Sequence, residues 1–283
     1  MTTPGSDRFW ICRTCAVEHA DRPDVCAICA DERQWVPATG QAWATLEELV
    51  AEGCAVEVAE LEPDLLALHT TPHLGIGQQA KVVRTPAGAL LWDPLGFVDD
   101  AGVAAVVDAA AGGDVVIAAS HPHMYGVQVE WSRRLAAATG RPVPVLVSEA
   151  DAGWVARPDA VVETWSGERE VLPGVVLSQP GGHFPGSAVV HWTGADGRGV
   201  LLSGDTIFAN PDRVTVSFMR SYPNRIPLSG AVVTRVAEHV ARRPFERLYN
   251  NFEGVIPADA RAVVLRSADR HAAWVRGDFD HLT

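Results

Sequence analysis

The sequence predicts a layered α/β protein preceded by a small cysteine-rich segment, and three observations support this prediction. Short apolar runs that end at Pro or Gly alternate with helical patterns over most of the chain. Four of the five cysteines form two close pairs near the N-terminus. The chain has 283 residues, of which 47% are hydrophobic, and this is enough for one large domain with a sizeable core plus a small one.

The cysteine pairs predict a metal knuckle over residues 1–40. They stand as "CRTC" and "CAIC", and the four thiols belong to Cys12, Cys15, Cys26 and Cys29. Two close pairs can bring four thiolates into a tetrahedron, which suits zinc, or iron in a rubredoxin-like site. A segment this short has too little core to fold unaided, so we expect its metal to supply much of its folding free energy. Pro37 and Gly40 then mark the boundary to a second domain, residues 41–283.

The rest of the chain reads as strands joined by turns and interleaved with helices. A helix is expected at 44–53, and strands are expected at 65–72, 80–85 and 89–94. The following pattern is helix 99–113, strand 114–120, helix 126–140, strand 143–148 and short helix 149–156. The last expected elements are strands 174–180, 187–194 and 199–205, helix 229–244 and strand 245–250.

Charge and hydropathy narrow the class of protein. Acidic residues outnumber basic ones by 35 to 23, which gives a formal net charge of −12. Nucleic-acid binding depends on clustered Lys and Arg, so this class of partner is disfavoured. The N-terminus lacks the pattern of a signal peptide, and no apolar run reaches the ~18 residues of a membrane span. We expect a cytoplasmic protein with a small-molecule substrate and no membrane partner, while homo-oligomerisation and a protein partner of the knuckle remain open.

Three sequence islands supply a second set of metal ligands. His121 and His123 follow the apolar run "DVVIAA", His183 lies in the glycine-rich turn "QPGGHFPGS", and Asp205 follows the apolar run "VLLSG". Loops at strand ends expose side chains, so these islands can converge at one edge of a sheet. Three imidazoles and a carboxylate suit zinc, iron or manganese, and the bound metal would make a water molecule acidic enough to attack at neutral pH.

Together, "HPHMYG", "GGHFPGS" and "LSGDT" resemble the motifs of the metallo-β-lactamase superfamily, in the family's order, over roughly residues 55 to 260. The resemblance implies an αββα sandwich with metal bound between the edges of the two sheets. It also implies that His121, His123 and His183 hold the first metal and that Asp205 is the aspartate that usually bridges two metals.

The sequence departs from this family at the second metal site. Tyr125 and Gly126 stand where the family has an aspartate and a histidine. The family's last histidine falls in "LYNNFEG", where Phe252 or a neighbouring Asn stands instead. Because all three ligands are absent together, we expect one metal, held by His121, His123, His183 and Asp205.

The expected function is that of a metal-dependent hydrolase of a small ester, thioester or lactone-like substrate. In this hypothesis Asp205 orients or deprotonates the attacking water. Tyr125 either stabilises a developing oxyanion or is a packed aromatic that fills the volume of the lost metal.

A further segment, "SFMRSYPNR", crowds polar groups where the family places a loop that faces the substrate. Arg220, Tyr222 and Asn224 are therefore candidate substrate-binding residues, with ordinary turn chemistry around Pro223 as the alternative.

Two other classes of function remain open. One is a redox protein, because a rubredoxin-like module joined to this fold also resembles the diiron flavoproteins. The other is a non-catalytic binding protein.

Overall fold

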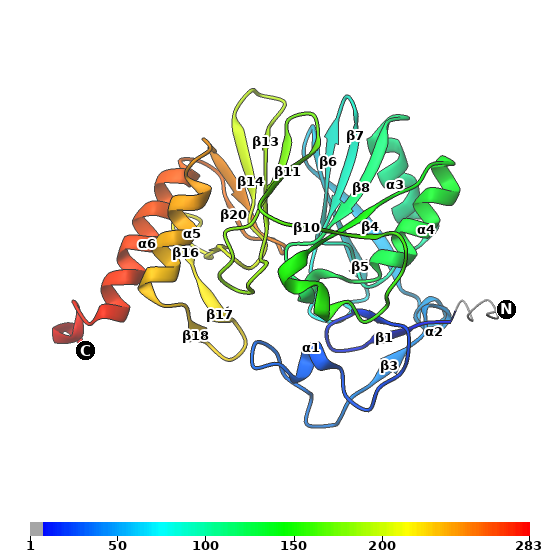
Figure 1. The fold of residues 1–283 in the computed structure, drawn as a ribbon, viewed down its shortest axis with the longest axis horizontal. Helices are drawn as coiled ribbons and strands as arrows, with labels where there is room; N and C mark the ends of the chain where they lie inside the picture. Colours follow the sequence, from blue (N-terminus) through cyan, green and yellow to red (C-terminus); the bar gives the residue numbers. More distant parts are fainter. Residues whose placement is uncertain (1–7) are drawn as a thin grey trace.

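A computed structural model describes residues 8–283 and has the expected αββα sandwich (Figure 1). Two sheets face each other in the centre, and helices cover the outer face of each. The cysteine-rich segment lies below both sheets in this view, against one edge of the sandwich. None of the helices within residues 8–283 combines the length and the apolar character needed to cross a membrane.

The first sheet has seven strands in the order β10-β9-β8-β7-β6-β5-β4. Their bounds are β4 Ala55–Glu62, β5 Leu65–Thr71, β6 Ala80–Thr85, β7 Gly88–Trp92, β8 Asp114–Ala118, β9 Val145–Ser148 and β10 Val162–Trp165. Strands β4 to β7 form an antiparallel meander, whereas β7 to β10 are parallel. The crossovers between parallel strands are helices α3 (Asp100–Ala110) and α4 (Gln128–Thr139), which cover the outer face of this sheet.

The second sheet has six strands in the order β11-β12-β13-β14-β19-β20. Their bounds are β11 Glu168–Leu172, β12 Val175–Ser178, β13 Val189–Thr193, β14 Gly199–Leu202, β19 Arg247–Tyr249 and β20 Val255–Ile256. Helices α5 (Gly230–Val240) and α6 (Ala260–Arg276) pack on each other and cover its outer face. Two small hairpins precede α5, namely β15 Phe208–Ala209 with β16 Val216–Ser217, and β17 Met219–Ser221 with β18 Ile226–Pro227.

Alternating side chains of the strands fill two different cores. In β7, Leu90 packs between the two sheets, whereas its neighbour Leu91 packs under the helices. Val116 and Ile117 of β8 divide in the same way. These strands are buried on both faces, which explains why their sequences are continuous apolar runs rather than alternating ones.

The knuckle is built on a three-stranded sheet in the order β2-β1-β3. Its elements are β1 Trp10–Cys12, β2 Glu18–His19, α1 Ala27–Ala30 and β3 Trp43–Ala44, and α2 (Leu46–Ala51) follows. Ile11 and Ile28 of the knuckle belong to the same buried cluster as the residues under α3 and α4. The two parts therefore share one continuous core, and the division at residue 40 stays a prediction.

Three differences from the expected elements have local physical causes. The segment 149–156 forms a 3-10 helix (η2, Glu149–Trp154) in place of a short α-helix, and Gly153 lies within it. Strand β4 was not expected, because its exposed face is rich in Glu, which strands normally avoid. Helix α6 was missed as well, because its buried face has helical spacing but consists largely of small or polar residues, among them Ala260, Ser267 and Ala268.

Candidate metal centre

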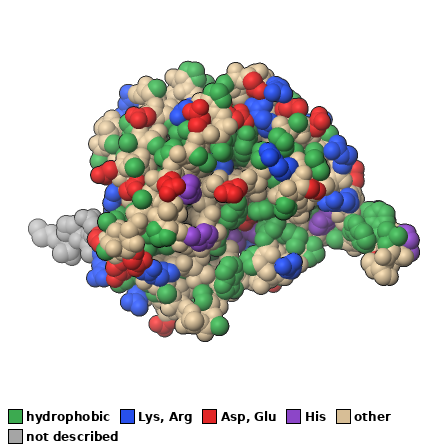
Figure 2. Space-filling model, turned by 180° about the vertical axis from the view of Figure 1, so that it is seen from behind, with side chains coloured by type: hydrophobic (Ala, Val, Ile, Leu, Met, Phe, Trp, Pro, Cys, Tyr) green, Lys and Arg blue, Asp and Glu red, His purple; other side chains and the backbone are tan. Residues whose placement is uncertain are grey.

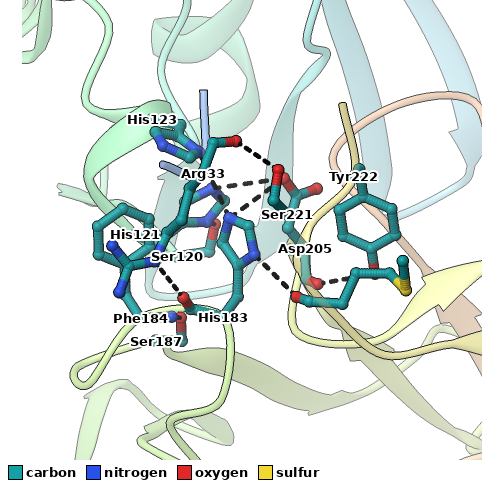
Figure 3. Close-up of polar contacts among 12 residues, drawn as sticks. Arg33, Ser120, His121, His123, His183, Phe184, Ser187, Asp205, Ser221 and Tyr222 are labelled. Atoms are coloured by element: carbon teal, nitrogen blue, oxygen red, sulfur yellow. Dashed lines mark hydrogen bonds and ion pairs between the residues drawn. The ribbon is translucent and has the colours of Figure 1, made fainter. Parts of the chain in front are cut away.

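The four ligands predicted from the sequence converge at one edge of the sandwich (Figure 3). His121 directly follows the loop after β8, and His123 lies in the 3-10 helix η1 (Pro122–Met124). His183 comes from the loop between β12 and β13, and Asp205 lies shortly after β14. All four residues are buried, and one ligand atom from each lies within 4.8 Å of the others. This cluster can hold a metal ion between the two sheets.

The spacing within the cluster fits a single tetrahedral ion. The Nε2 atom of His183 lies 3.4 Å from Nδ1 of His123, and Oδ2 of Asp205 lies 3.5 Å from Nε2 of His121. Metal–nitrogen bonds of about 2.0–2.1 Å would place tetrahedral ligand atoms about 3.3 Å apart. The Nε2 atom of His121, which faces the cluster, has no hydrogen-bond partner among the described residues although it is buried. A cation is the partner that such atoms need.

The protonation states of the cluster also suit a metal. Burial lowers the pKa of His183 to about 4 and holds the pKa of His123 well below its usual range. Burial by itself would raise the pKa of Asp205, but the neighbouring His121 and His183 lower it instead. Neutral imidazoles and an ionised carboxylate are the forms that bind metal.

Neighbouring groups fix the orientation of two of the imidazoles. Nδ1 of His121 lies 2.9 Å from Oγ of Ser120, which donates in turn to a carboxylate oxygen of Asp93. Nδ1 of His183 lies 3.0 Å from the carbonyl oxygen of Met219. Both histidines therefore present Nε2 to the centre of the cluster.

Backbone packing leaves no room for a side chain at Gly126, where the resemblance would place a metal-binding histidine. This residue has φ +51, and a Cβ atom there would lie 2.1 Å from the carbonyl oxygen of Pro94. The carbonyl of Gly126 accepts a hydrogen bond from the backbone amide of Glu18 in the knuckle. The Glu18 carboxylate then accepts from the backbone amide of Val129 in α4. The chain thus uses this position to hold the knuckle.

Tyr125 lies beside Gly126 and is almost completely buried in the core. Its hydroxyl group donates to the carbonyl oxygen of Asp151 at 3.1 Å. Burial raises the pKa of this phenol well above its usual range, so the hydroxyl keeps its proton. A role in stabilising an oxyanion would require the bond to Asp151 to break, and these contacts favour the packed-aromatic alternative.

Tyr125→Phe is therefore expected to change stability rather than turnover. The loss of one buried hydrogen bond should lower the free energy of unfolding by about 1 kcal/mol, because the Asp151 carbonyl loses its donor. Metal content should stay at the wild-type value. Chemical denaturation and metal analysis of the variant measure both, and a drop in turnover of about 10²-fold would instead assign the phenol to catalysis.

At the position of the family's last histidine, Asn251 is the residue that approaches the cluster. Its side chain is buried and helps to lower the pKa of Asp205. Phe252 lines a cavity whose wall also includes Asp205. The sequence alone left open which of these residues occupies the site.

The four knuckle cysteines form a second cluster that can hold metal. Sγ of Cys12 lies 3.6 Å from Sγ of Cys29, and Sγ of Cys15 lies 3.8 Å from Sγ of Cys26. A tetrahedron with metal–sulfur bonds of about 2.3 Å has edges of about 3.8 Å, so this geometry fits zinc or iron. Hydrogen bonding from the neighbouring thiol of Cys15 lowers the pKa of Cys12 to about 6, which favours the thiolate.

Two polar side chains support this cysteine cluster from outside. Nε2 of His19 lies 3.4 Å from Sγ of Cys26, and Nε2 of Gln41 donates to Sγ of Cys12. Such donors stabilise thiolates that bind a metal. The fifth cysteine, Cys54, is half-buried and lies outside the cluster.

The three candidate substrate-binding residues occupy different positions. Arg220 forms an ion pair with Glu32 of the knuckle, and the Asn224 side chain donates to the backbone carbonyls of Glu32 and Gln34. Tyr222 lines a cavity and donates its hydroxyl hydrogen bond to the backbone carbonyl of Asp205. Arg220 and Asn224 thus hold the knuckle in place, and their role in binding a substrate stays a prediction.

A cavity of about 510 Å³ opens onto the histidine–aspartate cluster at Asp205. Its lining residues come from three parts of the chain and are Gln34, Trp35, His73, Gly75, Ile76, Asp205, Phe208, Tyr222, Pro223 and Phe252. Of this set, only Asp205 and Tyr222 are functional residues predicted from the sequence. Gln34 and Trp35 join the others because the knuckle folds against the sandwich edge.

Comparison with known proteins supports the fold and identifies a relative. No model of a known protein family matches the sequence. The DIM-1 metallo-β-lactamase structure has a TM-score of 0.55 and 11% identity, and it covers 77% of this chain and 98% of its own. The FIM-1 metallo-β-lactamase from Pseudomonas aeruginosa, in its mono-zinc form, has a TM-score of 0.53 and 14% identity, with 77% and 96% covered. The metallo-β-lactamase fold predicted from the motifs is therefore confirmed.

A curated protein matches over nearly the whole sequence. The uncharacterized protein YmaE of Bacillus subtilis (strain 168) is 39% identical over 279 residues, which cover 96% of this chain and 99% of the relative. The match is too long to leave out the knuckle. The chain belongs to the same family as YmaE, with a metallo-β-lactamase fold.

Proposed function

We propose that this protein is a metal-dependent hydrolase of a small ester, thioester or lactone-like substrate, with one metal ion at the histidine–aspartate cluster. The observation that carries the proposal is the opening of an apolar cavity onto Asp205, one of the four clustered ligands. A zinc, iron or manganese ion bound there would polarise a carbonyl group and lower the pKa of a water molecule.

The chain's own residues would position the reactants. Oδ1 of Asp205 has no hydrogen-bond partner among the described residues, and it can orient the attacking water and accept its proton. The hydroxyl of Tyr222 holds the backbone at Asp205 and so steadies that carboxylate. Aromatic and aliphatic side chains around the cavity would exclude bulk water from the reacting carbonyl.

The function is tested with fully metal-loaded protein and a panel of esters, thioesters and lactones. We expect turnover of at least one class, and an Asp205→Asn variant should lower it by 10²-fold or more, because the amide cannot accept the proton and binds the metal more weakly than a carboxylate. A protein that holds its metal and hydrolyses none of the panel would favour the binding-protein alternative instead.

A single ion at this cluster is a separate prediction, tested by crystals grown in excess zinc or manganese. Gly126 offers no side chain to a second ion, and FIM-1 with the same fold was solved in a mono-zinc form. We therefore expect one ion at the histidine–aspartate cluster and one at the cysteines. Two ions about 4 Å apart at the former cluster would contradict this prediction.

The metal identity separates the hydrolase from the redox alternative. Zinc at both clusters would support hydrolysis, whereas iron with visible thiolate absorption at the cysteines would favour electron transfer. Elemental analysis of protein purified without added metal distinguishes these cases.

A further inference from the structure

The knuckle contributes two side chains to the cavity that leads to Asp205. These are Gln34 and Trp35, which follow the last metal-binding cysteine, Cys29, by only five and six residues. They form one wall, and Phe208, Tyr222 and Phe252 of the sandwich line other parts of the cavity. These two side chains line the cavity because the knuckle is docked against the sandwich.

Several contacts hold this wall in a defined position. The guanidinium group of Arg33 donates from Nε to the carbonyl of His183 at 2.7 Å and lies 4.0 Å from the centroid of the Phe184 ring. The hydroxyl of Ser221 donates to the carbonyl of Arg33, and the Asn224 amide donates to the carbonyl of Gln34. Figure 3 shows Arg33 alongside the histidines and Ser221 close to it. The backbone at residues 33–35 is therefore anchored directly to the metal centre.

Gln34 presents a buried acceptor that the protein itself does not use. Its side chain is only 6% exposed, and Oε1 has no hydrogen-bond partner within the described part of the chain. A buried, unpaired amide oxygen costs about 1–3 kcal/mol. A ligand N–H or O–H group that reaches Oε1 from the cavity would remove this cost.

The other residues that line the cavity indicate which chemical group would lie next to that donor in a ligand. Trp35 is 44% exposed, and its large apolar surface faces a cavity that also contains Ile76, Phe208 and Phe252. Among the residues lining this cavity there is no Lys or Arg, so no fixed side-chain cation awaits an anionic group. The wall therefore suits an uncharged apolar or aromatic group.

We propose that Gln34 and Trp35 of the knuckle determine substrate specificity, and that they select a substrate with an apolar group next to an N–H or O–H donor. This inference rests on the proposed function only in treating the bound molecule as a substrate. It concerns binding and can be tested without turnover. Gln34 accepts the hydrogen bond, and Trp35 packs against the apolar group. The knuckle then acts as a part of the binding site in addition to its role in the core.

The test uses two uncharged methyl ketones that lack a leaving group at the ketone. One is N-acetyl-phenylalanine methyl ketone, and the other replaces its amide N–H by CH2. Binding to metal-loaded protein is followed by NMR of the tryptophan indole N–H groups, and the Trp35 signal is assigned from a Trp35→Phe variant. In the wild-type protein both probes should shift the Trp35 signal. The N–H probe should bind about tenfold more tightly than the CH2 probe, which is the effect of one hydrogen bond.

Variants assign this preference to the two residues. Gln34→Met keeps the volume and should reduce the preference to about one, whereas Gln34→Glu keeps an acceptor and should preserve it. Trp35→Ala should weaken both probes by about tenfold, because each loses the same aromatic contact. Trp274→Ala is the matched control, since Trp274 is 43% exposed but lies in the last part of α6 and not at the cavity. This end of the molecule projects from the body with exposed apolar side chains (Figure 2). Metal content should be unchanged in all four variants.

The outcomes separate this inference from the hydrolase proposal. An unchanged preference in Gln34→Met, or a Trp35 signal that neither probe moves, overturns the role of the wall even if some ester is hydrolysed. The expected binding pattern in a protein that hydrolyses nothing supports the wall and contradicts the hydrolase.

Discussion

The double substitution Cys12→Ser and Cys26→Ser is expected to lower the metal content from two ions per chain to one and to destabilise the knuckle severely. Each substitution removes one ligand from a different close pair of the cysteine cluster. Structural zinc sites of small domains contribute roughly 10 kcal/mol or more of folding free energy. Because Ile11 and Ile28 share a core with the sandwich, loosening should extend to the contacts around α3 and α4.

Metal analysis and limited proteolysis measure this effect. We expect the remaining ion to stay at the histidine–aspartate cluster and new cleavage sites to appear before residue 45. Cys54→Ser is the matched control, since Cys54 lies outside the cluster, and it should change neither metal content nor cleavage. Two ions retained in the double variant would disprove the cysteine site.

The substitution His183→Ala should have the second largest effect, the loss of the ion at the histidine–aspartate cluster. Its Nε2 atom lies 3.4 Å from the neighbouring ligand His123, and it also lies 3.9 Å from the carboxylate of Asp205. Without His183 the ion would have only three protein ligands and one open side, so both bound metal and any hydrolysis should disappear. The cysteine cluster should keep its ion.

A buried histidine outside the site provides the control. His191 lies in β13 with Nε2 3.2 Å from the carbonyl of Val240, and burial lowers its pKa to about 4, as it does for His183. His191→Ala should lower thermal stability yet leave two ions bound. Equal metal loss in both variants would mean that the effect comes from general destabilisation of the sheet.

Local patterns were sufficient to predict the cysteine cluster, the individual histidine and aspartate ligands and a layered α/β fold, whereas the αββα arrangement came from the resemblance to a known family. Two ligands in each close cysteine pair are brought together by short-range backbone geometry, as are His121 and His123. His183 and Asp205 follow apolar strands, so their convergence followed from the resemblance to a known arrangement. Elements with weak patterns were missed, above all α6, whose buried face consists largely of small or polar residues.

The walls of the cavity were decided by the tertiary structure alone. Asn224 bonds to the carbonyl of Gln34 across 190 residues of sequence, and no local signal in either segment indicates this pairing. Contacts with the knuckle occupy the side chains of Arg220 and Asn224, although the polar segment that contains them suggested a surface that binds substrate. Whether a side chain can bind metal depends on its own chemistry and on its near neighbours in the sequence. The shape of a cavity depends on how segments that are distant in the sequence and carry no motif pack together. For this reason the sequence by itself determined where metal can bind, and only the folded chain determined what can approach it.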